Sequence, residues 1–354
     1  MSSLTPPACR FYAFLPALRL AVCGDRAAQQ HFDREYGPRA LADAPDHVEV
    51  SIQFVSDGRR GIRPPAAGGS DGGGHKSVRW TVALSGPSDR PLQAAISLRG
   101  WPRSFGLSLV QGYFVEALLS LAAPGSGHIL LPAAAIDSDA GPVLILGPSG
   151  AGKSSLSARA IARGRMVIGD DQVLLDATGR CTAFPRRMRF YPDLRATAPE
   201  AYRALSGPAR GLLRARGIVD RLTGGYVRPS LVVDPVDMGR RRELSSGVIR
   251  RVLFLEPRAP VVDMEVTSSD MVALLSDARH LFESQRARLW SIAPEGWRDA
   301  IAPIAAQEQK ILRSALDGLP FERVRIPAGW PPKRSVEALA QLIGLTSEPI
   351  APAS

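Results

Sequence analysis

The chain has 354 residues, of which 45% are hydrophobic, and 44 lysines and arginines against 34 aspartates and glutamates give a formal net charge of +10. This length is enough for two domains with hydrophobic cores, and the composition excludes a disordered chain. The three cysteines, Cys9, Cys23 and Cys181, are odd in number and far apart. We therefore expect no disulfide framework and no metal cluster from them, and a cytoplasmic, reducing location.

The positive charge comes mainly from arginine, which raises the question of nucleic-acid binding. Arginines cluster at residues 186–189 and 240–242, and Arg210, Arg214 and Arg216 lie along one predicted helix. The sequence has no zinc finger, RNA-recognition signature or basic strand with interleaved aromatic residues. We therefore expect mostly solvated arginines, with an acidic partner or substrate as the alternative, and the pattern does not favour nucleic acid.

Alternating apolar and polar residues dominate the first hundred positions. The stretch from Phe11 to Cys23 is apolar but contains Arg19 and is too short to span a bilayer, so we interpret it as a strand and expect no membrane contact. Further strands are predicted at residues 47–57, 78–84 and 92–98, with a flexible glycine-rich loop at residues 64–74. These patterns predict a β-rich recognition module over residues 1–105 and a second domain over residues 106–354.

The second domain begins with a helix, predicted at residues 107–121 from apolar residues at helical spacing, and a strand hairpin at residues 128–146. The hairpin leads into the run Gly-Pro-Ser-Gly-Ala-Gly-Lys-Ser, a complete Walker A motif, and then into a predicted helix at residues 155–162. Glycines let the backbone wrap phosphates closely, and the helix N-terminus favours anions. The predicted nucleotide-binding residues are Gly147, Pro148, Ser149, Gly150, Ala151, Gly152, Lys153, Ser154 and Ser155.

Two adjacent carboxylates follow the next predicted strand. Residues 165–168 form a short apolar run that ends at Gly169, and Asp170 and Asp171 come directly after it. One carboxylate can hold Mg²⁺ while the other accepts a proton from an attacking hydroxyl. Beyond them the sequence predicts strands at residues 181–184, 252–256 and 321–326, and helices at residues 271–281, 307–316 and 336–343. The arginine-rich helical segment at residues 197–222 is interpreted as a cap or an acceptor-binding insertion.

The motif and the acid pair resemble the HPr kinase/phosphorylase family, in which an aspartate pair begins seventeen residues after the loop lysine, as Asp170 does after Lys153. The resemblance implies an α/β fold with a P-loop kinase core of HPr-kinase/PEP-carboxykinase type. It implies that Asp170 is the base and that Asp171 binds Mg²⁺ with Ser154, although the reverse assignment of the two aspartates is also open. It also implies catalytic roles for Lys153, for His128 at the start of the hairpin, and for Arg228, which would contact the transferring phosphate.

The function that these residues predict is ATP-dependent transfer of the γ-phosphoryl group to a hydroxyl, such as a serine, of a protein, peptide or small molecule. The expected cofactors are ATP and Mg²⁺, and the resemblance favours a homo-oligomer. The glycine-rich signature of true HPr kinase/phosphorylases is absent, so HPr as substrate and phosphorylase activity are not implied. The alternative is a P-loop NTPase or nucleotide switch that acts through its basic surface. A PEP-carboxykinase-like enzyme is disfavoured because paired metal-binding lysine and histidine residues are not found.

Overall fold

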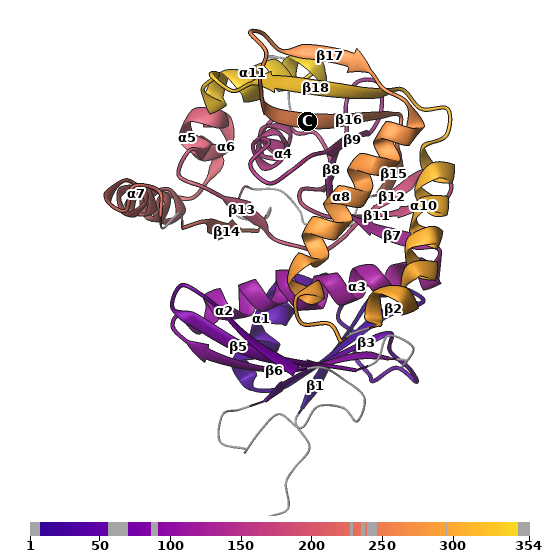
Figure 1. The fold of residues 1–354 in the computed structure, drawn as a ribbon. Coiled ribbons are helices and arrows are strands. Elements are labelled where there is room, and N and C mark those ends of the chain that lie inside the picture. Colours follow the sequence, from indigo (N-terminus) through magenta and orange to yellow (C-terminus); the bar gives the residue numbers. More distant parts are fainter. Residues whose placement is uncertain are drawn as a thin grey trace, which may run out of the picture. The chain divides into compact units, whose positions relative to one another are not determined.

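The computed structural model describes residues 8–55, 70–85, 91–226, 229–234, 238, 246–294 and 296–345 and has a mixed α/β fold (Figure 1). The chain forms two compact units. One contains Met1–Leu130 and Phe282–Ile311, and the other contains Leu131–Leu281 and Leu312–Ser354. The first unit therefore extends past the expected boundary at residue 105 and includes a segment from the carboxy-terminal part of the chain.

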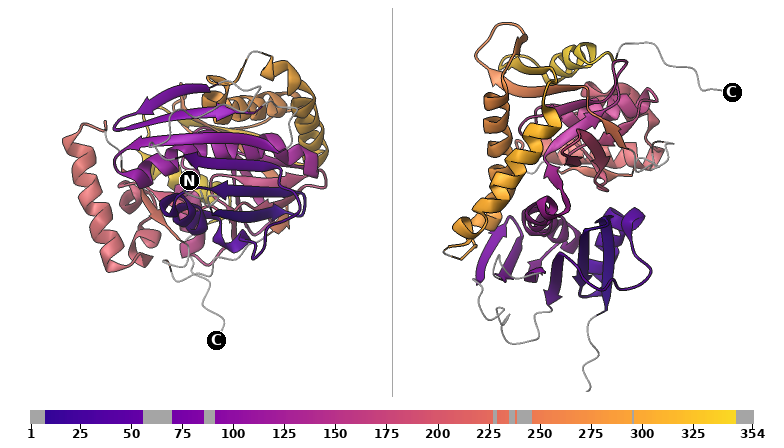
Figure 2. Two further views of the ribbon diagram at one scale, coloured as in Figure 1. Left: turned by 90° about the horizontal axis from the view of Figure 1, so that it is seen from below. Right: turned by 90° about the vertical axis from the view of Figure 1, so that its right-hand side faces the viewer.

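A six-stranded sheet forms the first unit, in the order β1-β2-β3-β6-β5-β4, and the left view of Figure 2 looks onto it. Its strands are β1 (Cys9–Leu15), β2 (Leu18–Cys23), β3 (Val50–Val55), β4 (Ser70–His75), β5 (Val78–Leu84) and β6 (Leu92–Gly100). The alternation expected for β3, β5 and β6 is confirmed, because their apolar side chains are buried at every second position.

Two expectations for this unit are wrong in detail. The apolar stretch between residues 11 and 23 is two antiparallel strands, β1 and β2, because a tight turn follows Leu15. Part of the expected loop at residues 64–74 is the edge strand β4, which pairs with β5 over its whole length. Backbone pairing with β5 outweighs the low strand propensity of three consecutive glycines there. Residues 64–69 lie outside the described part of the chain.

The β1–β2 hairpin also places two cysteines opposite each other. Cys9 and Cys23 are paired in the strand register, their Cα atoms are 4.0 Å apart, and they form a disulfide. The expectation of no disulfide is therefore wrong for this pair. The two cysteines are 14 residues apart in the sequence, but the hairpin makes them neighbours in space. Cys181 is free and buried.

Helices α1 (Arg26–Tyr36), α2 (Arg103–Val110) and α3 (Glu116–Ala122) belong to the same unit. Asp25 caps α1 by accepting a hydrogen bond from the Ala28 amide at 2.9 Å. A π-helical turn, Gln111–Val115, joins α2 to α3, so the helix expected at residues 107–121 is confirmed and is longer. Among the described residues one helical stretch, Arg103–Ser126, is long and apolar enough to cross a membrane, and 72% of its most apolar window is buried within the protein, as in a core helix.

A mixed six-stranded sheet forms the second unit, in the order β10-β8-β9-β16-β18-β17. The hairpin expected at residues 128–146 is confirmed only from residue 133 onward, where β8 (Ala133–Ile136) and β9 (Val143–Leu146) form it; residues 128–131 are a separate strand outside this sheet. Strand β9 is parallel to β16 (Arg251–Ala259). Strand β18 (Phe321–Pro327) joins the sheet parallel to β16, as expected from the sequence. The remaining strands are β10 (Val167–Gly169) and β17 (Glu265–Ser268). Through β7 (His128–Leu131) the chain passes from the first unit to the second.

The other strands of the second unit lie outside this sheet. Strands β11 (Val173–Asp176), β12 (Arg180–Ala183) and β15 (Ser246–Val248) are adjacent and antiparallel. Strands β13 (Met188–Phe190) and β14 (Leu231–Val233) form a separate pair. The helices that follow or flank these strands are α4 (Lys153–Ala162), α5 (Leu194–Thr197), α6 (Pro199–Ala204), α7 (Gly207–Leu222) and α11 (Pro332–Leu342).

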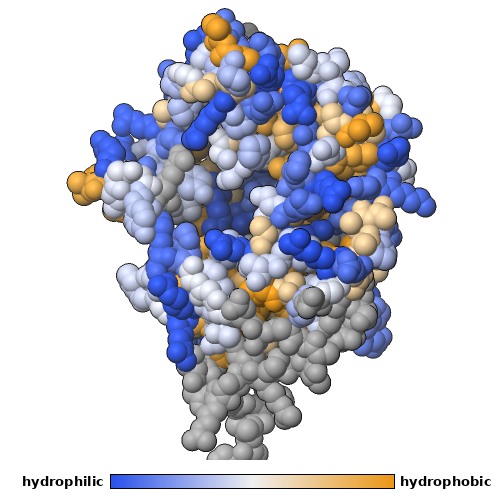
Figure 3. Space-filling model, viewed as in Figure 1, coloured by the Kyte–Doolittle hydropathy of each residue, from blue (hydrophilic) through white to orange (hydrophobic). Residues whose placement is uncertain are grey.

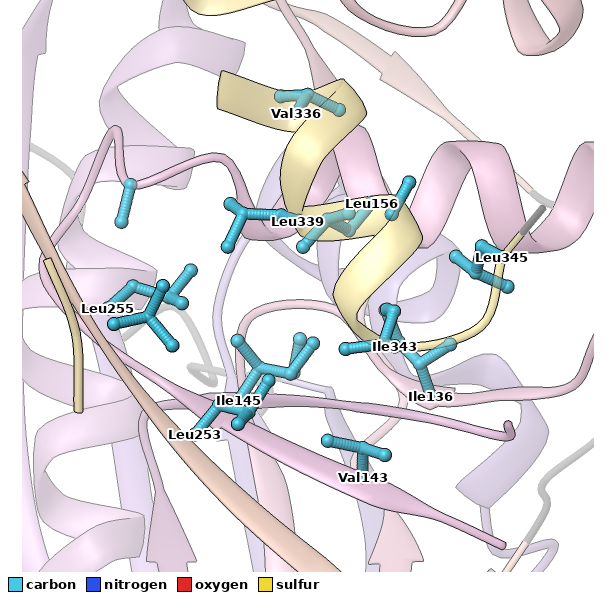
Figure 4. Packing of buried hydrophobic residues seen from close by; sticks show 14 of the residues in the cluster. Ile136, Val143, Ile145, Leu156, Leu253, Leu255, Val336, Leu339, Ile343 and Leu345 are labelled. Atoms are coloured by element: carbon cyan, nitrogen blue, oxygen red, sulfur yellow. The ribbon is translucent and has the colours of Figure 1, made fainter. Parts of the chain in front are cut away.

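Three further helices contain residues of the carboxy-terminal third: α8 (Met271–Trp290), α9 (Trp297–Ala300) and α10 (Ala302–Leu316). Buried apolar residues fix α11 and α4 against the main sheet of the second unit. Figure 4 shows Val336, Leu339 and Ile343 of the α11 region in one cluster with Ile145 and Leu253 of the strands. This cluster also includes Leu156 of α4. The start of α4, where the Walker A motif ends, is therefore held by the core of this unit.

Candidate functional site

The glycine-rich loop at residues 147–152 connects the end of β9 to the start of α4, which confirms the expected order of strand, loop and helix. Gly147 has a φ of +143°, and a Cβ atom at this position would lie 2.8 Å from the carbonyl oxygen of Leu255. Only glycine allows this close approach of the loop to strand β16. Gly152 is also left-handed, with a φ of +100°, and it is the N-cap residue of α4.

The first turn of α4 presents donors that the helix itself does not use. The first intrahelical bond runs from the Leu156 amide to the Gly152 carbonyl at 3.0 Å, so the preceding amides have no partner within the helix. The Lys153 ammonium donates to the carbonyls of Gly147 at 2.5 Å and Pro148 at 3.0 Å. Burial lowers the pKa of Lys153, and the charges of Asp171 and Asp170 oppose this. The loop thus gathers positive potential at the end of β9.

The strand topology brings the acid pair to the same edge of the sheet. Strand β8 is antiparallel to both β9 and β10, so β9 and β10 run in the same direction and end at the same edge. Asp170 and Asp171 follow the last residue of β10, as the sequence predicts. Both carboxylates are close enough to the Lys153 ammonium to affect its pKa.

Asp170 is partly buried among hydroxyl groups. Burial and the neighbouring charge of Asp171 raise its pKa to about 6, while the nearby hydroxyls of Ser157 and Ser154 and the charge of Lys153 act in the opposite direction. A carboxylate with a pKa near neutrality exchanges protons readily at neutral pH. The environment of Asp170 is therefore that of a general base or acid.

Asp171 has a different environment, although it is the next residue. Partial withdrawal from water raises its pKa, but the charges of Arg186, Lys153 and Arg189 outweigh this and hold the pKa below its usual range. Its Oδ2 atom forms an ion pair with Nη1 of Arg186, whose side chain is only 14% exposed. Asp171 consequently stays ionised across the physiological pH range.

Sequence reasoning did not assign Arg186 and Arg189 to this site, because it treated residues 186–189 as a basic surface run. The β11–β12 hairpin explains their position. Its register pairs Val173 with Ala183, so the chain that enters β11 after Asp171 and the chain that leaves β12 before Arg186 lie side by side. The turn at residues 176–179, with aspartate first and glycine last, is the sequence signal that predicts such a hairpin.

The acid pair and Ser154 have the chemical character of a magnesium site. Oδ1 of Asp170 is buried and has no hydrogen-bond partner within the described part of the chain. Mg²⁺ prefers oxygen ligands, and it commonly takes one or two carboxylates together with water and substrate phosphates. The residues therefore fit this ion. In the described ranges, groups of three or more histidine, cysteine, aspartate or glutamate side chains that could hold a metal without a substrate are absent.

The other predicted site residues are placed as follows. The Ser155 hydroxyl donates to Oγ1 of Thr197 at 3.0 Å, which ties α4 to α5. His128 starts β7 in the first unit, where its Nδ1 atom lies 2.9 Å from the Ser126 carbonyl oxygen. Arg228 lies outside the described residues, so its role stays a prediction.

Comparison of the chain with known protein families and with curated proteins finds no match. The assignment of a function therefore depends on the geometry and electrostatics of the loop and the acid pair.

Proposed function

We propose that this protein is an ATP-dependent kinase that transfers the γ-phosphoryl group to a hydroxyl, with a P-loop core of the HPr-kinase type. The observation that carries the proposal is the meeting of Lys153 with Asp170 and Asp171 beside the start of α4. A phosphate-binding loop alone accounts for nucleotide binding. Two carboxylates with opposite pKa shifts, next to that loop, supply both an ion-binding group and a proton acceptor.

In this proposal the amides of the loop and of the first turn of α4 bind the phosphates of ATP, and Lys153 turns from its loop carbonyls to the outer phosphate oxygens. Asp171 and Ser154 would hold Mg²⁺, which when bound offsets the charge of the β- and γ-phosphates. Asp170 removes the proton from the acceptor hydroxyl. Arg186 and Arg189, whose charges act on Asp171, would stabilise charge on the transferring group.

Two observations bear on the roles of the two aspartates and favour opposite assignments. The pKa of about 6 favours Asp170 as the base, whereas its position beside the Ser154 hydroxyl favours Asp170 as the residue next to the ion. We adopt Asp170 as the base because Asp171 stays ionised and suits a cation ligand. Titration with Mg²⁺ separates the roles: the variant of the ion-binding residue needs more Mg²⁺ for half-maximal binding of ATP, and the variant of the base does not.

The activity is tested with γ-labelled ATP, Mg²⁺ and extract from the source cells. Stable label on an acceptor, lost in the Asp170→Asn protein although ATP still binds, supports the kinase. Release of inorganic phosphate without a labelled acceptor supports instead an NTPase or nucleotide switch. Lys153→Ala is expected to weaken both ATP binding and transfer, and Arg180→Ala, on an exposed position of β12, serves as the control.

A further inference from the structure

Helix α7 has an apolar face that points away from the protein. Leu213 is the buried residue of this helix, yet four large apolar side chains are exposed on it: Leu212 by 46%, Ile218 by 51%, Val219 by 42% and Leu222 by 82%. Figure 3 shows hydrophobic atoms at the left margin of the molecule, where α7 lies in Figure 1. Exposed apolar side chains that gather on one element commonly mark an interaction surface.

The exposed residues are regularly spaced. Leu212, Ala215, Val219 and Leu222 follow one another at intervals of three, four and three residues, which is the spacing of a helix seam that contacts another helix. Ile218 extends the same face. Leu213 lies on the opposite side of the helix from the middle of this face and packs in the core. Helix α7 therefore has one side for the protein and another side for a partner.

Charge indicates the kind of partner. Helix α7 contains four arginines and one aspartate, and Arg214 and Arg221, seven residues apart, are exposed along one edge of the apolar face. A second copy of α7 would bring arginines against arginines, which disfavours self-association. Nucleic acid would match the charge but would leave the apolar face in water. An amphipathic segment with acidic flanks matches both features.

The helix is joined to the candidate site through one hydrophobic cluster in the second unit. Leu213 packs in the cluster that contains Ala158 and Ile161 of α4 and Met188 and Phe190 of β13. Arg214 also donates to the Tyr202 hydroxyl of α6 at 2.8 Å. The surface of α7 is therefore anchored on the helix that begins with Lys153 and on the strand that carries Arg189.

We propose that the outer face of α7 docks an acidic, amphipathic segment of the protein or peptide that accepts the phosphoryl group. The identity of the partner as the acceptor rests on the proposed kinase function. Binding of such a segment to α7 does not rest on the kinase function, because the binding depends only on the apolar face and on Arg214 and Arg221.

The binding test uses a labelled model peptide of about three heptads with leucine at the a and d positions and glutamate at the e and g positions. A matched peptide has lysine in place of each glutamate. Fluorescence anisotropy with the full chain, without ATP, is expected to show tighter binding of the glutamate peptide. This preference should weaken as the salt concentration rises, because salt screens the exposed arginines.

Two sets of variants assign the binding to α7. Leu212→Glu combined with Leu222→Glu is expected to weaken binding of the glutamate peptide at least about tenfold, because both substitutions remove apolar contact and add like charge. Val262→Glu is the matched control, since Val262 is 90% exposed and lies outside the helix. Arg214→Glu combined with Arg221→Glu should reverse the preference, so that the lysine peptide binds better.

The proposal is overturned if the two peptides bind equally or not at all, or if the α7 variants behave like Val262→Glu. Two other outcomes also overturn it. One is that the chain forms a dimer that depends on Leu212 and Leu222. The other is that a DNA or RNA duplex displaces the peptide and the two peptides bind equally. Circular dichroism shows whether each variant is folded. Failure of the kinase proposal would appear in the γ-labelled ATP experiment and would leave the peptide result unchanged.

Discussion

Nη1 of Arg186 forms an ion pair with Oδ2 of Asp171, and the hairpin of β11 and β12 brings the two residues together. The carboxylate is 55% exposed and the guanidinium only 14%, so the arginine is held by the protein while the aspartate faces outward. This pairing keeps Asp171 ionised and gives it a fixed direction. It also places a guanidinium next to the carboxylate that is proposed to hold Mg²⁺.

We expect Arg186→Ala to reduce phosphoryl transfer about a hundredfold, because loss of one preorganised donor at a developing charge has effects of that size. The substitution also raises the pKa of Asp171, since the charge of Arg186 is the largest of those that lower it. Transfer measured with γ-labelled ATP at pH 7.5 checks the rate, and an NMR titration of the Asp171 carboxyl group checks the rise of its pKa. An Arg186→Ala protein with the parental rate would show that Arg186 has no part in the reaction.

Opposite stability changes are expected from Asp170→Asn and Asp171→Asn. The folded-state pKa of Asp170 is raised from 3.8 to about 6, so the folded protein favours the protonated carboxyl group. The free energy of unfolding therefore falls as the pH rises and Asp170 ionises. Asp170→Asn should therefore raise the free energy of unfolding at pH 7.5 by about 1 to 3 kcal/mol. This gain should shrink as the pH falls through 6 towards 3.8.

The neighbouring residue supplies the control. The pKa of Asp171 is lowered, so its ionised form contributes stability that is present above its ordinary pKa and lost as the pH falls through the lowered value. Asp171→Asn is expected to destabilise the protein at pH 7.5, and the loss should vanish in acid. Urea unfolding of both variants at several pH values measures the two effects. Changes of the same sign would contradict the environments assigned to the pair.

A buried ion pair in the first unit predicts a large stability loss. Arg286 donates to Glu308 and, from Nε at 2.8 Å, to the Ser120 hydroxyl, and the side chains of Arg286 and Glu308 are only 5% and 4% exposed. Glu308→Ala leaves the guanidinium buried without its counter-charge, which should cost about 3 to 5 kcal/mol. Asp263→Ala breaks the exposed pair with Arg334 and should cost less than about 1 kcal/mol. Denaturant titration compares the two; similar losses would be incompatible with this difference in burial.

Thiol titration tests the pairing of Cys9 with Cys23. The unfolded protein without reductant should show one reactive thiol, Cys181, and the folded protein should react slowly, because burial raises the pKa of Cys181 to about 12. With reductant, all three cysteines should react after unfolding. Cys23→Ser should lower the free energy of unfolding by about 3 kcal/mol, as expected for closure of a loop of this length. Three free thiols in the unreduced protein would rule out the disulfide.

Much of the candidate site could be predicted because it is encoded locally. The loop, Lys153 and the acid pair lie within a short stretch, and the strand, loop and helix around them have clear patterns of apolar residues and glycine. Strand β18 was also predictable, since Val324 and Ile326 alternate with arginines within it. In each case the information lies within one element and its neighbours along the chain.

The features that the sequence did not predict depend on pairing between distant residues. The place of Arg186 depends on the register of β11 and β12, and the disulfide depends on the β1–β2 hairpin. Strand β4 contains three consecutive glycines, and only its pairing with β5 gives it strand structure. Local propensity favours a loop in that segment, and tertiary pairing outweighs it.

The contacts of Arg286 constrain the order in which the protein can fold during synthesis. Ser120 is made early, but Arg286 and Glu308 follow some 160 residues or more later, and all three belong to one compact unit. The amino-terminal sheet therefore cannot complete its unit until residue 311 of 354 has left the ribosome, after the glycine-rich loop and both aspartates. A chain interrupted before Phe282 would contain the whole amino-terminal sheet and still lack the segment that completes its unit.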